Sequence, residues 1–368
     1  MVNETRLVGE FLRLVQIDSP TRQERKVADY LKQRLGELGL QVQEDLAGES
    51  LCSDSGNLIA RLEGQGPCLM FCAHMDTVQP GAGIVPVLED GVITSAGETI
   101  LGGDDKAGIC VILEALQTVL ERGLPHPKLV VVFTVAEEGG LRGAKYLDVS
   151  DLGVEMGFCL DAGGPVGSMV RRGPAQNQLQ AVITGRAAHA GICPENGISA
   201  IQVAAEGIMR TRLGRIDPET TANIGVISGG KASNIVPERV ELEGEARSLD
   251  VDKLAKQTRH MVETLEKVCR DRGAKLELTC IEAYPSIDLP EDSPVIRLAA
   301  EGFRLVGLVP QVIQTGGGSD ANIFNGRDLP TLNLGIGMEK VHTCEEFIRV
   351  KDMVDLAKVL VKIMNLAV

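Results

Sequence analysis

Residues 68–76, CLMFCAHMD, form a short apolar run that ends directly in a histidine and an aspartate. A continuous apolar run of this length is typical of a strand buried on both faces, as in a parallel sheet. Similar runs occur at residues 57–62, 128–135 and 156–160, and residues 106–122 have the apolar spacing of a helix. Strands that alternate with helices predict an α/β fold with a largely parallel sheet covered on both faces.

The N-terminal region predicts a further helix. Val27, Leu31 and Leu35 recur at helical spacing, and the pattern ends near Gly39. Thr21 and Glu24 have the spacing of a capping box, so we expect them to cap the start of this helix.

The pattern changes near Gly173. Downstream we predict, in order, a strand, a helix, two strands, a helix and a strand, at residues 179–185, 198–213, 222–227, 239–247, 251–272 and 275–281. This βαββαβ order is that of a ferredoxin-like domain. After Pro285 the α/β pattern resumes. We therefore predict a discontinuous α/β domain, residues 1–175 and 283–368, with an inserted ferredoxin-like α+β lid domain at 176–282.

Composition excludes several classes of protein. The 368 residues carry 37 basic and 51 acidic side chains, a net charge of −14, which disfavours binding to nucleic acid. No apolar run is long enough to span a membrane. The N-terminal MVNETRLVGEFLRLVQ does not resemble a signal peptide, and the nine cysteines are scattered without CxxC spacing. Reduced thiols in a cytoplasmic protein are the simplest interpretation.

Polar residues cluster where the predicted strands end. Carboxyl ends of parallel strands meet at one edge of a sheet, so these side chains are expected to lie close together. Individually, a histidine after a strand or two aspartates before a helix are ordinary structural features. Together, so many carboxylates would repel one another without a cation, so the sequence predicts a divalent-metal site. Its candidates are His74, Asp76, Asp104, Glu137, Glu138, Asp161 and His342.

The chain resembles the co-catalytic di-zinc peptidase family that includes peptidase T, glutamate carboxypeptidase and aminoacylase. The motifs are FCAHMDT, TILGGDDKAG, FTVAEEGGLRGAK, CLDAGG, GGGSDA and VHTCEEF, in this order along nearly the whole chain. LGGDDKAG and Asp161 are most similar to the peptidase T-like branch. The chain lacks the longer segment that peptidase T carries between its His-x-Asp and DDKAG motifs.

The resemblance implies a role for each of these positions. Asp104 would bridge two divalent ions, with His74 and Asp161 completing one coordination sphere and Glu138 and His342 the other. Zinc is the expected metal, although Mn²⁺ and Co²⁺ accept the same ligand types. The resemblance further implies that Asp76 orients His74, that Glu137 is the general base, and that the peptide bond between Asp104 and Asp105 is cis.

Weaker candidates lie in the predicted lid and in the glycine-rich loop that follows it. His189, Asn234 and Arg247 match lid positions that contact substrate in the family, and Gly317 lies in the GGGSD loop, which resembles a substrate loop. An exposed turn histidine, a surface ion pair and an ordinary glycine turn are the competing interpretations. The resemblance also implies a homodimer through the lid.

We therefore expect a cytoplasmic two-metal aminopeptidase acting on short peptides, similar to a tripeptidase. An N-acyl amino acid deacylase or a carboxypeptidase with the same centre is the alternative, because no motif reports recognition of a free amine. Residues 225–231, GVISGGK, nearly match a phosphate-binding loop, but Ala232 replaces the required hydroxyl residue. A non-catalytic protein on this fold is disfavoured because all catalytic positions are occupied.

Overall fold

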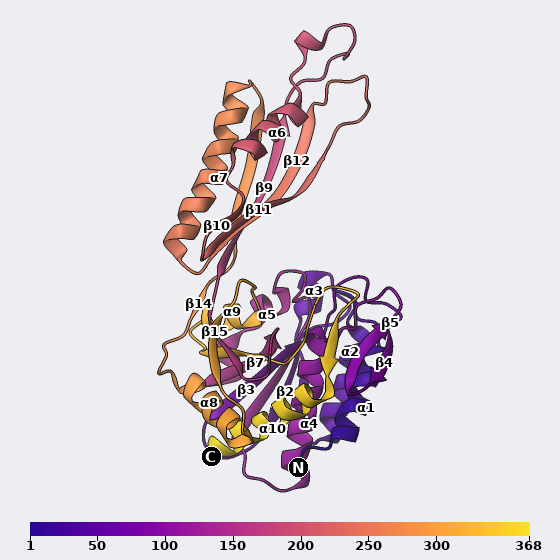
Figure 1. The fold of residues 1–368 in the computed structure, drawn as a ribbon, viewed down its shortest axis with the longest axis vertical. Coiled ribbons are helices and arrows are strands. Elements are labelled where there is room, and N and C mark those ends of the chain that lie inside the picture. Colours follow the sequence, from indigo (N-terminus) through magenta and orange to yellow (C-terminus); the bar gives the residue numbers. More distant parts are fainter. The chain divides into compact units, whose positions relative to one another are not determined.

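The computed structural model describes residues 1–368, and the chain divides into two compact units. The large unit comprises Met1–Arg172, Asp288–Gln314 and Ser319–Val368. The small unit comprises Gly173–Ile287 and Thr315–Gly318. The predicted combination of an α/β unit and a ferredoxin-like α+β unit is confirmed by the topology of the two sheets (Figure 1).

A nine-stranded sheet forms the centre of the large unit, in the order β1-β2-β6-β3-β7-β16-β8-β14, with β15 also paired to β8. The central strands β6, β3, β7 and β16 are parallel, and β1 and β2 are antiparallel to their neighbours. The strand bounds are β1 Gln41–Glu44, β2 Leu58–Leu62, β3 Cys68–His74, β6 Lys128–Thr134, β7 Met156–Ala162, β8 Ser168–Gly173, β14 Ile287–Asp288, β15 Gln311–Gln314 and β16 Thr331–Gly335.

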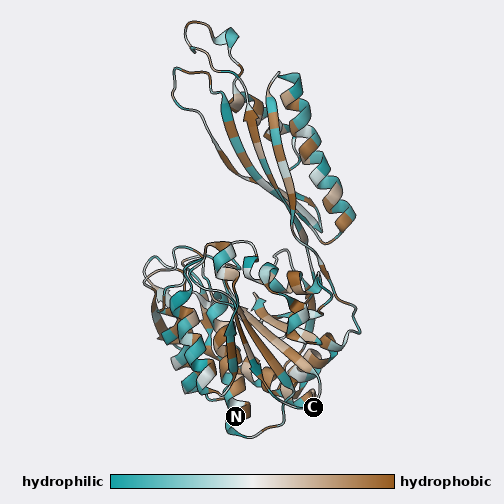
Figure 2. Ribbon diagram, turned by 180° about the vertical axis from the view of Figure 1, so that it is seen from behind, coloured by the Kyte–Doolittle hydropathy of each residue, from teal (hydrophilic) through white to brown (hydrophobic).

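Helices cover this sheet, and its central strands are the strongly hydrophobic part of the unit (Figure 2). Helix α4 is buried along most of its length and packs against β3, α1 and α10. In the absence of tryptophan, the sheet core is filled by aliphatic residues and by phenylalanines. Among these are Phe133 and the stacked pair Phe71 and Phe158, whose ring centroids are 5.7 Å apart. The helices are α1 Glu4–Val15, α2 Arg25–Glu37, α3 Ala47–Leu51, α4 Gly103–Glu121, α5 Arg142–Tyr146, α8 Pro294–Val306, α9 Asp320–Asn325 and α10 Val350–Leu366.

A three-stranded antiparallel sheet in the large unit was not predicted from the sequence. It consists of β4 (Val85–Glu89), β5 (Val92–Ala96) and β17 (Phe347–Arg349), in the order β17-β5-β4. Strand β17 begins at Phe347, the last residue of the VHTCEEF motif, so its pairing with β5 anchors the carboxyl end of that motif.

The predicted capping box is wrong. Helix α2 begins at Arg25 after Glu24, whose side chain makes no capping hydrogen bond. Glu24 instead accepts hydrogen bonds from the main chains of Arg22 and Ala136, and Thr21 donates to Asp76. Both side chains therefore bond residues that are distant in the chain, Asp76 and Ala136, in place of the capping contacts that the spacing predicts.

The small unit is a five-stranded antiparallel sheet, β10-β11-β12-β9-β13, with helices α6 and α7 packed on it. Alternate residues of the strands join one face of both helices in a single hydrophobic core, which includes Leu179, Leu242 and Leu265. Strand β10 was not predicted. The bounds are β9 Ala175–Thr184, α6 Ala200–Arg210, β10 Gly214–Asp217, β11 Thr220–Gly229, β12 Arg239–Ser248, α7 Val251–Asp271 and β13 Lys275–Tyr284.

No helix in the structure combines the length and apolar character that crossing a bilayer requires. All nine cysteines are free thiols, of which Cys52, Cys280 and Cys344 are exposed.

One charge cluster of the large unit makes stability depend on pH. Partial burial opposes ionisation of the Glu44 carboxyl. Hydrogen bonds from Arg25, the Gly56 N–H and Lys32 outweigh this effect and lower the pKa of Glu44 to about 2. Because this pKa is depressed relative to the unfolded chain, the stabilisation is fully present above about pH 5 and is lost as the pH falls toward 2.

We expect Glu44→Gln to lower the free energy of unfolding of the metal-free protein by about 1 kcal/mol at pH 7, and by progressively less between pH 5 and pH 3. Urea unfolding at these pH values measures the difference. Glu89→Gln, at an exposed position of β4, is the control. A difference between wild type and Glu44→Gln that grows toward pH 3 would contradict the assignment.

Candidate metal centre

The candidate side chains of the large unit gather at the carboxyl edge of the parallel strands. His74 is the last residue of β3, Asp161 is near the end of β7, and Glu137 and Glu138 follow β6. Strand β3 pairs in parallel with both β6 and β7, so the three strands end at the same edge.

Asp104 reaches the same edge from the turn that opens helix α4. Its backbone is not helical (φ −80°, ψ 105°), and Gly102 before it is left-handed, with φ 70°. The Asp104–Asp105 peptide bond is cis, as the resemblance predicted. The Asp105 carboxylate accepts hydrogen bonds from the main-chain N–H groups of His74, at 3.2 Å, and Gly108, at 3.1 Å. Asp105 therefore ties the end of β3 to the start of α4.

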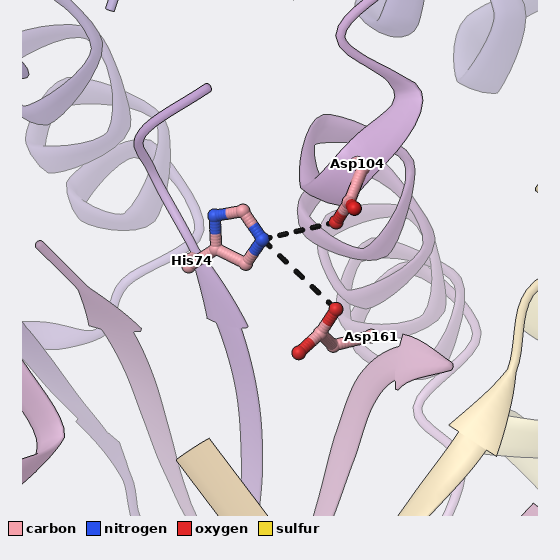
Figure 3. A group of neighbouring side chains, drawn as sticks. All are labelled: His74, Asp104 and Asp161. Carbon is pink, nitrogen blue, oxygen red and sulfur yellow. Dashed lines mark hydrogen bonds and ion pairs between the residues drawn. The ribbon is translucent and has the colours of Figure 1, made fainter. Parts of the chain in front are cut away.

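His74, Asp104 and Asp161 form one group of potential metal ligands, and their side chains point toward one another in Figure 3. The His74 Nε2 atom lies 3.0 Å from Asp104 Oδ1 and 4.0 Å from Asp161 Oδ1. The donor atoms of the group all lie within 4.8 Å of one another. A cation among them would have one imidazole and two carboxylates.

Asp104, Glu138 and His342 form the second group. His342 lies in the loop after β16 and has a positive φ of 64°. Its Nε2 atom is 3.2 Å from Asp104 Oδ2 and 2.9 Å from Glu138 Oε1. The two oxygens of Asp104 thus face different histidines, the arrangement that a carboxylate bridging two cations requires.

The contacts of His74 determine which ring nitrogen faces the ligand group. Its Nδ1 atom is 2.9 Å from the main-chain oxygen of Asp76 and 3.4 Å from the Asp76 carboxylate. A carbonyl oxygen can only accept, so Nδ1 carries the proton and Nε2, beside Asp104, is the ligand atom. The shorter contact of Nδ1 is therefore with the main-chain oxygen of Asp76 rather than with its carboxylate.

The Asp76 carboxylate has a different set of partners. It is fully buried and accepts hydrogen bonds from the main-chain N–H groups of Glu137, at 2.9 Å, and Glu138, at 3.2 Å, and from the Thr21 hydroxyl, at 2.7 Å. Buried Glu24 accepts from the Ala136 N–H at 3.0 Å. These contacts hold the turn that presents Glu137 and Glu138.

The electrostatics of the site are those of a buried cluster of acids. Burial and the neighbouring charge of Asp161 raise the pKa of Glu137 well above its usual range, and burial together with Asp104 does the same to Asp161. Against the effect of burial, the neighbouring imidazoles of His342 and His74 lower the pKa of Asp104. Hydrogen bonds to Asp104 and Glu138 raise the pKa of His342 to about 10.

These residues fit two divalent cations. The two ligand groups share Asp104, each has one imidazole and carboxylate oxygens, and mutual repulsion disfavours ionisation of the acids unless positive charge is nearby. Nitrogen and carboxylate ligands suit zinc and also Mn²⁺ or Co²⁺. Glu137 lies beside them, because its carboxylate is within 4.8 Å of ligand atoms of His74 and Glu138.

The four weaker candidates lie in the small unit, where they form two pairs. The main chain of Asn234 accepts a hydrogen bond from Ala190, next to His189, and both His189 and Asn234 are exposed. Arg247 makes a two-point ion pair with Glu245, at 2.9 and 3.0 Å. Its Nη1 atom also lies 3.5 Å from the main-chain oxygen of Gly316, beside Gly317.

Four residues that support the site are not among the candidates that the sequence predicts. These are Thr21, Glu24, Asp105 and Glu346, each with a side-chain hydrogen bond to a candidate residue or to the turn that carries one. Asp105 and Glu346 were within quoted motifs, but each sits beside a second acidic residue, and the sequence gives no signal that separates the two. The spacing of Thr21 and Glu24 predicts only a local capping role.

The fold places two groups of potential metal ligands, which share Asp104, at one edge of a largely parallel sheet, and comparison with known proteins identifies the family. The chain belongs to peptidase family M20/M25/M40, whose model matches residues 70–366. It is therefore a peptidase of the hydrolase class, and the family predicted from the motifs is confirmed.

Two solved structures and one relative are similar to this chain over nearly their whole lengths. A tripeptidase from Staphylococcus aureus subsp. aureus Mu50 is 41% identical, with a TM-score of 0.94, and covers 100% of this chain and 99% of its own. The aminopeptidase PepT from Bacillus cereus ATCC 10987 is 40% identical, with a TM-score of 0.89 and the same coverage. The protein YqjE of Bacillus subtilis (strain 168) is 41% identical over 367 residues, 99% of each chain. The chain thus lies in the peptidase T-like branch of its family.

Proposed function

We propose that this protein is a two-metal aminopeptidase that removes the N-terminal residue of tripeptides and other short peptides. One observation carries the reaction class: the two oxygens of Asp104 face different histidines, with Glu137 buried beside them. Similarity to an aminopeptidase and a tripeptidase at 40% and 41% identity supports the substrate class.

In this proposal, Asp104 would contribute to holding both ions, His74 and Asp161 would hold one, and Glu138 and His342 would hold the other. Two bound divalent ions would polarise the scissile carbonyl and lower the pKa of water at the site. Zinc is the metal we expect, from the mixture of imidazole and carboxylate ligands.

Glu137 is the proposed general base. Its carboxylate takes a proton from the attacking water and delivers it to the nitrogen of the leaving amine. The hydrogen bond from its main-chain N–H to Asp76 fixes the turn from which it acts. Asp76 thereby serves two groups, because its main-chain oxygen also orients the His74 ring.

The small unit is proposed to supply substrate contacts. His189 would stabilise the oxyanion, and Asn234, Arg247 and Gly317 would bind polar groups of the peptide. We further propose that this unit forms a homodimer interface. Variants of these four residues should raise KM or lower kcat without changing metal content.

The deciding experiment compares Leu-Gly-Gly with its N-acetylated form, with metal-loaded protein and a chelator-treated control. We expect release of leucine from the free peptide only, detected by mass spectrometry, and no cleavage after chelation. Release of the C-terminal glycine first would indicate a carboxypeptidase, and removal of the acetyl group a deacylase. Both outcomes would contradict the aminopeptidase proposal.

A further inference from the structure

Two adjacent glutamates of the VHTCEEF motif have opposite environments. Glu345 is exposed, and its carboxylate pairs only with Lys340 across the same loop. Glu346 is 1% exposed and lies directly before β17. A buried carboxylate is costly unless several donors satisfy it, so its partners show what it does.

All three hydrogen bonds to the Glu346 carboxylate come from the turn that carries Asp104. Oε2 accepts from the main-chain N–H groups of Leu101, at 2.8 Å, and Gly102, at 2.9 Å. Oε1 accepts from the N–H of Asp104 itself, at 3.1 Å. This turn opens helix α4, and the first N–H groups of a helix have no acceptors within it.

The same residue also fixes the second ligand loop. Glu346 follows His342 by four residues, and β17 holds the chain just after it. One side chain therefore links the main chain of Asp104 to the loop of His342, whose imidazole lies 3.2 Å from Asp104 Oδ2.

We propose that Glu346 is a positioning residue that sets Asp104 between the two metal positions and holds the His342 loop against it. This inference rests on the two-metal centre proposed above. Glutamine cannot replace Glu346 here, because donors face both carboxylate oxygens and the amide NH₂ would oppose one of them. At least one N–H of the turn would lose its acceptor.

The test is a Co²⁺ titration of metal-free Glu346→Gln, followed by the visible absorption of the bound ion, with Glu345→Gln as the matched control. The control removes the same charge from the neighbouring position. We expect Glu346→Gln to bind Co²⁺ about 10- to 100-fold more weakly with an altered spectrum, and Glu345→Gln to behave as wild type. We also expect kcat on Leu-Gly-Gly to fall while KM changes little.

Gly103→Ala disturbs the same contact from the opposite side. An added Cβ at Gly103 would lie 3.0 Å from Glu346 Oε1 with other atoms at 3.8 Å or more, and the φ of Gly103 is not positive. We expect a smaller loss of Co²⁺ affinity in the same direction, which provides a test should Glu346→Gln not fold.

The outcomes separate this inference from the function on which it rests. Wild-type affinity and spectrum in folded Glu346→Gln, with two ions bound to the wild-type protein, would overturn the role of Glu346 alone. If Glu346→Gln does not fold, wild-type behaviour of Gly103→Ala overturns it. A wild-type protein that binds fewer than two ions would overturn the two-metal proposal and this inference with it.

Discussion

Replacing Glu137 with glutamine is expected to lower kcat by at least about 100-fold while leaving two metal ions bound. Glutamine keeps the shape of the side chain but cannot take a proton from water at neutral pH. The proposed ligands keep all their donor atoms, and the N–H of residue 137 still reaches Asp76. KM should change little, because the lost interaction concerns proton transfer rather than binding.

Steady-state kinetics on Leu-Gly-Gly and metal analysis of the same sample measure the two effects together. Glu345→Gln, an exposed glutamate whose partner is Lys340, controls for the loss of one negative charge. Near-normal kcat in Glu137→Gln would remove Glu137 from the mechanism. Loss of one metal in this variant would instead show that Glu137 is a metal ligand. Its position beside His74 and Glu138 is the reason for measuring the metal content.

Replacing Asp104 with alanine is expected to abolish the binding of both ions and to lower kcat/KM by at least about 1,000-fold. Each of its carboxylate oxygens faces a different ligand group, so both groups lose a donor. Without the bound cations, less positive charge would offset the repulsion among the remaining carboxylates. Glu138→Ala is the informative comparison, because Glu138 belongs with Asp104 to only one of the two proposed coordination spheres.

Inductively coupled plasma mass spectrometry after gel filtration should give two ions for wild type, one for Glu138→Ala and none for Asp104→Ala. Circular dichroism checks that the variants fold. Two ions in Asp104→Ala would contradict the bridging role, and two ions in Glu138→Ala would contradict its assignment as a ligand.

The candidate site could be assembled from sequence because its residues follow buried strands. The runs that end at His74, before Glu137 and at Asp161 are recognisably apolar, and parallel neighbours must end at one edge. Asp104 is recognisable in the same way, because it lies in a glycine-flanked turn at the start of a long apolar helix. The small unit was recognised by its order of strands and helices, apart from short β10.

The roles of the supporting residues could not be predicted from the sequence. Thr21 and Glu24 have capping-box spacing, yet they bond Asp76 and Ala136, 55 and 112 residues further along the chain. Spacing along the chain predicts only partners that are close in sequence. The partners that compete with them are distant in sequence and come close only in the folded chain. The sheet of β4, β5 and β17 could not be predicted from the sequence either. Strand β17 is only three residues long, and its partner β5 is distant in the chain.

Sequence alone thus determined the strand ends, the family motifs and the set of metal-ligand candidates, because apolar runs and their polar ends are local features. The tertiary structure decided the rest: which nitrogen of His74 faces Asp104, and which glutamate of the adjacent pair is buried. Glu346 meets donors 242 to 245 residues earlier in the chain, whereas Glu345 faces solvent. Two identical neighbouring side chains acquire different roles because the fold brings buried N–H groups to only one of them.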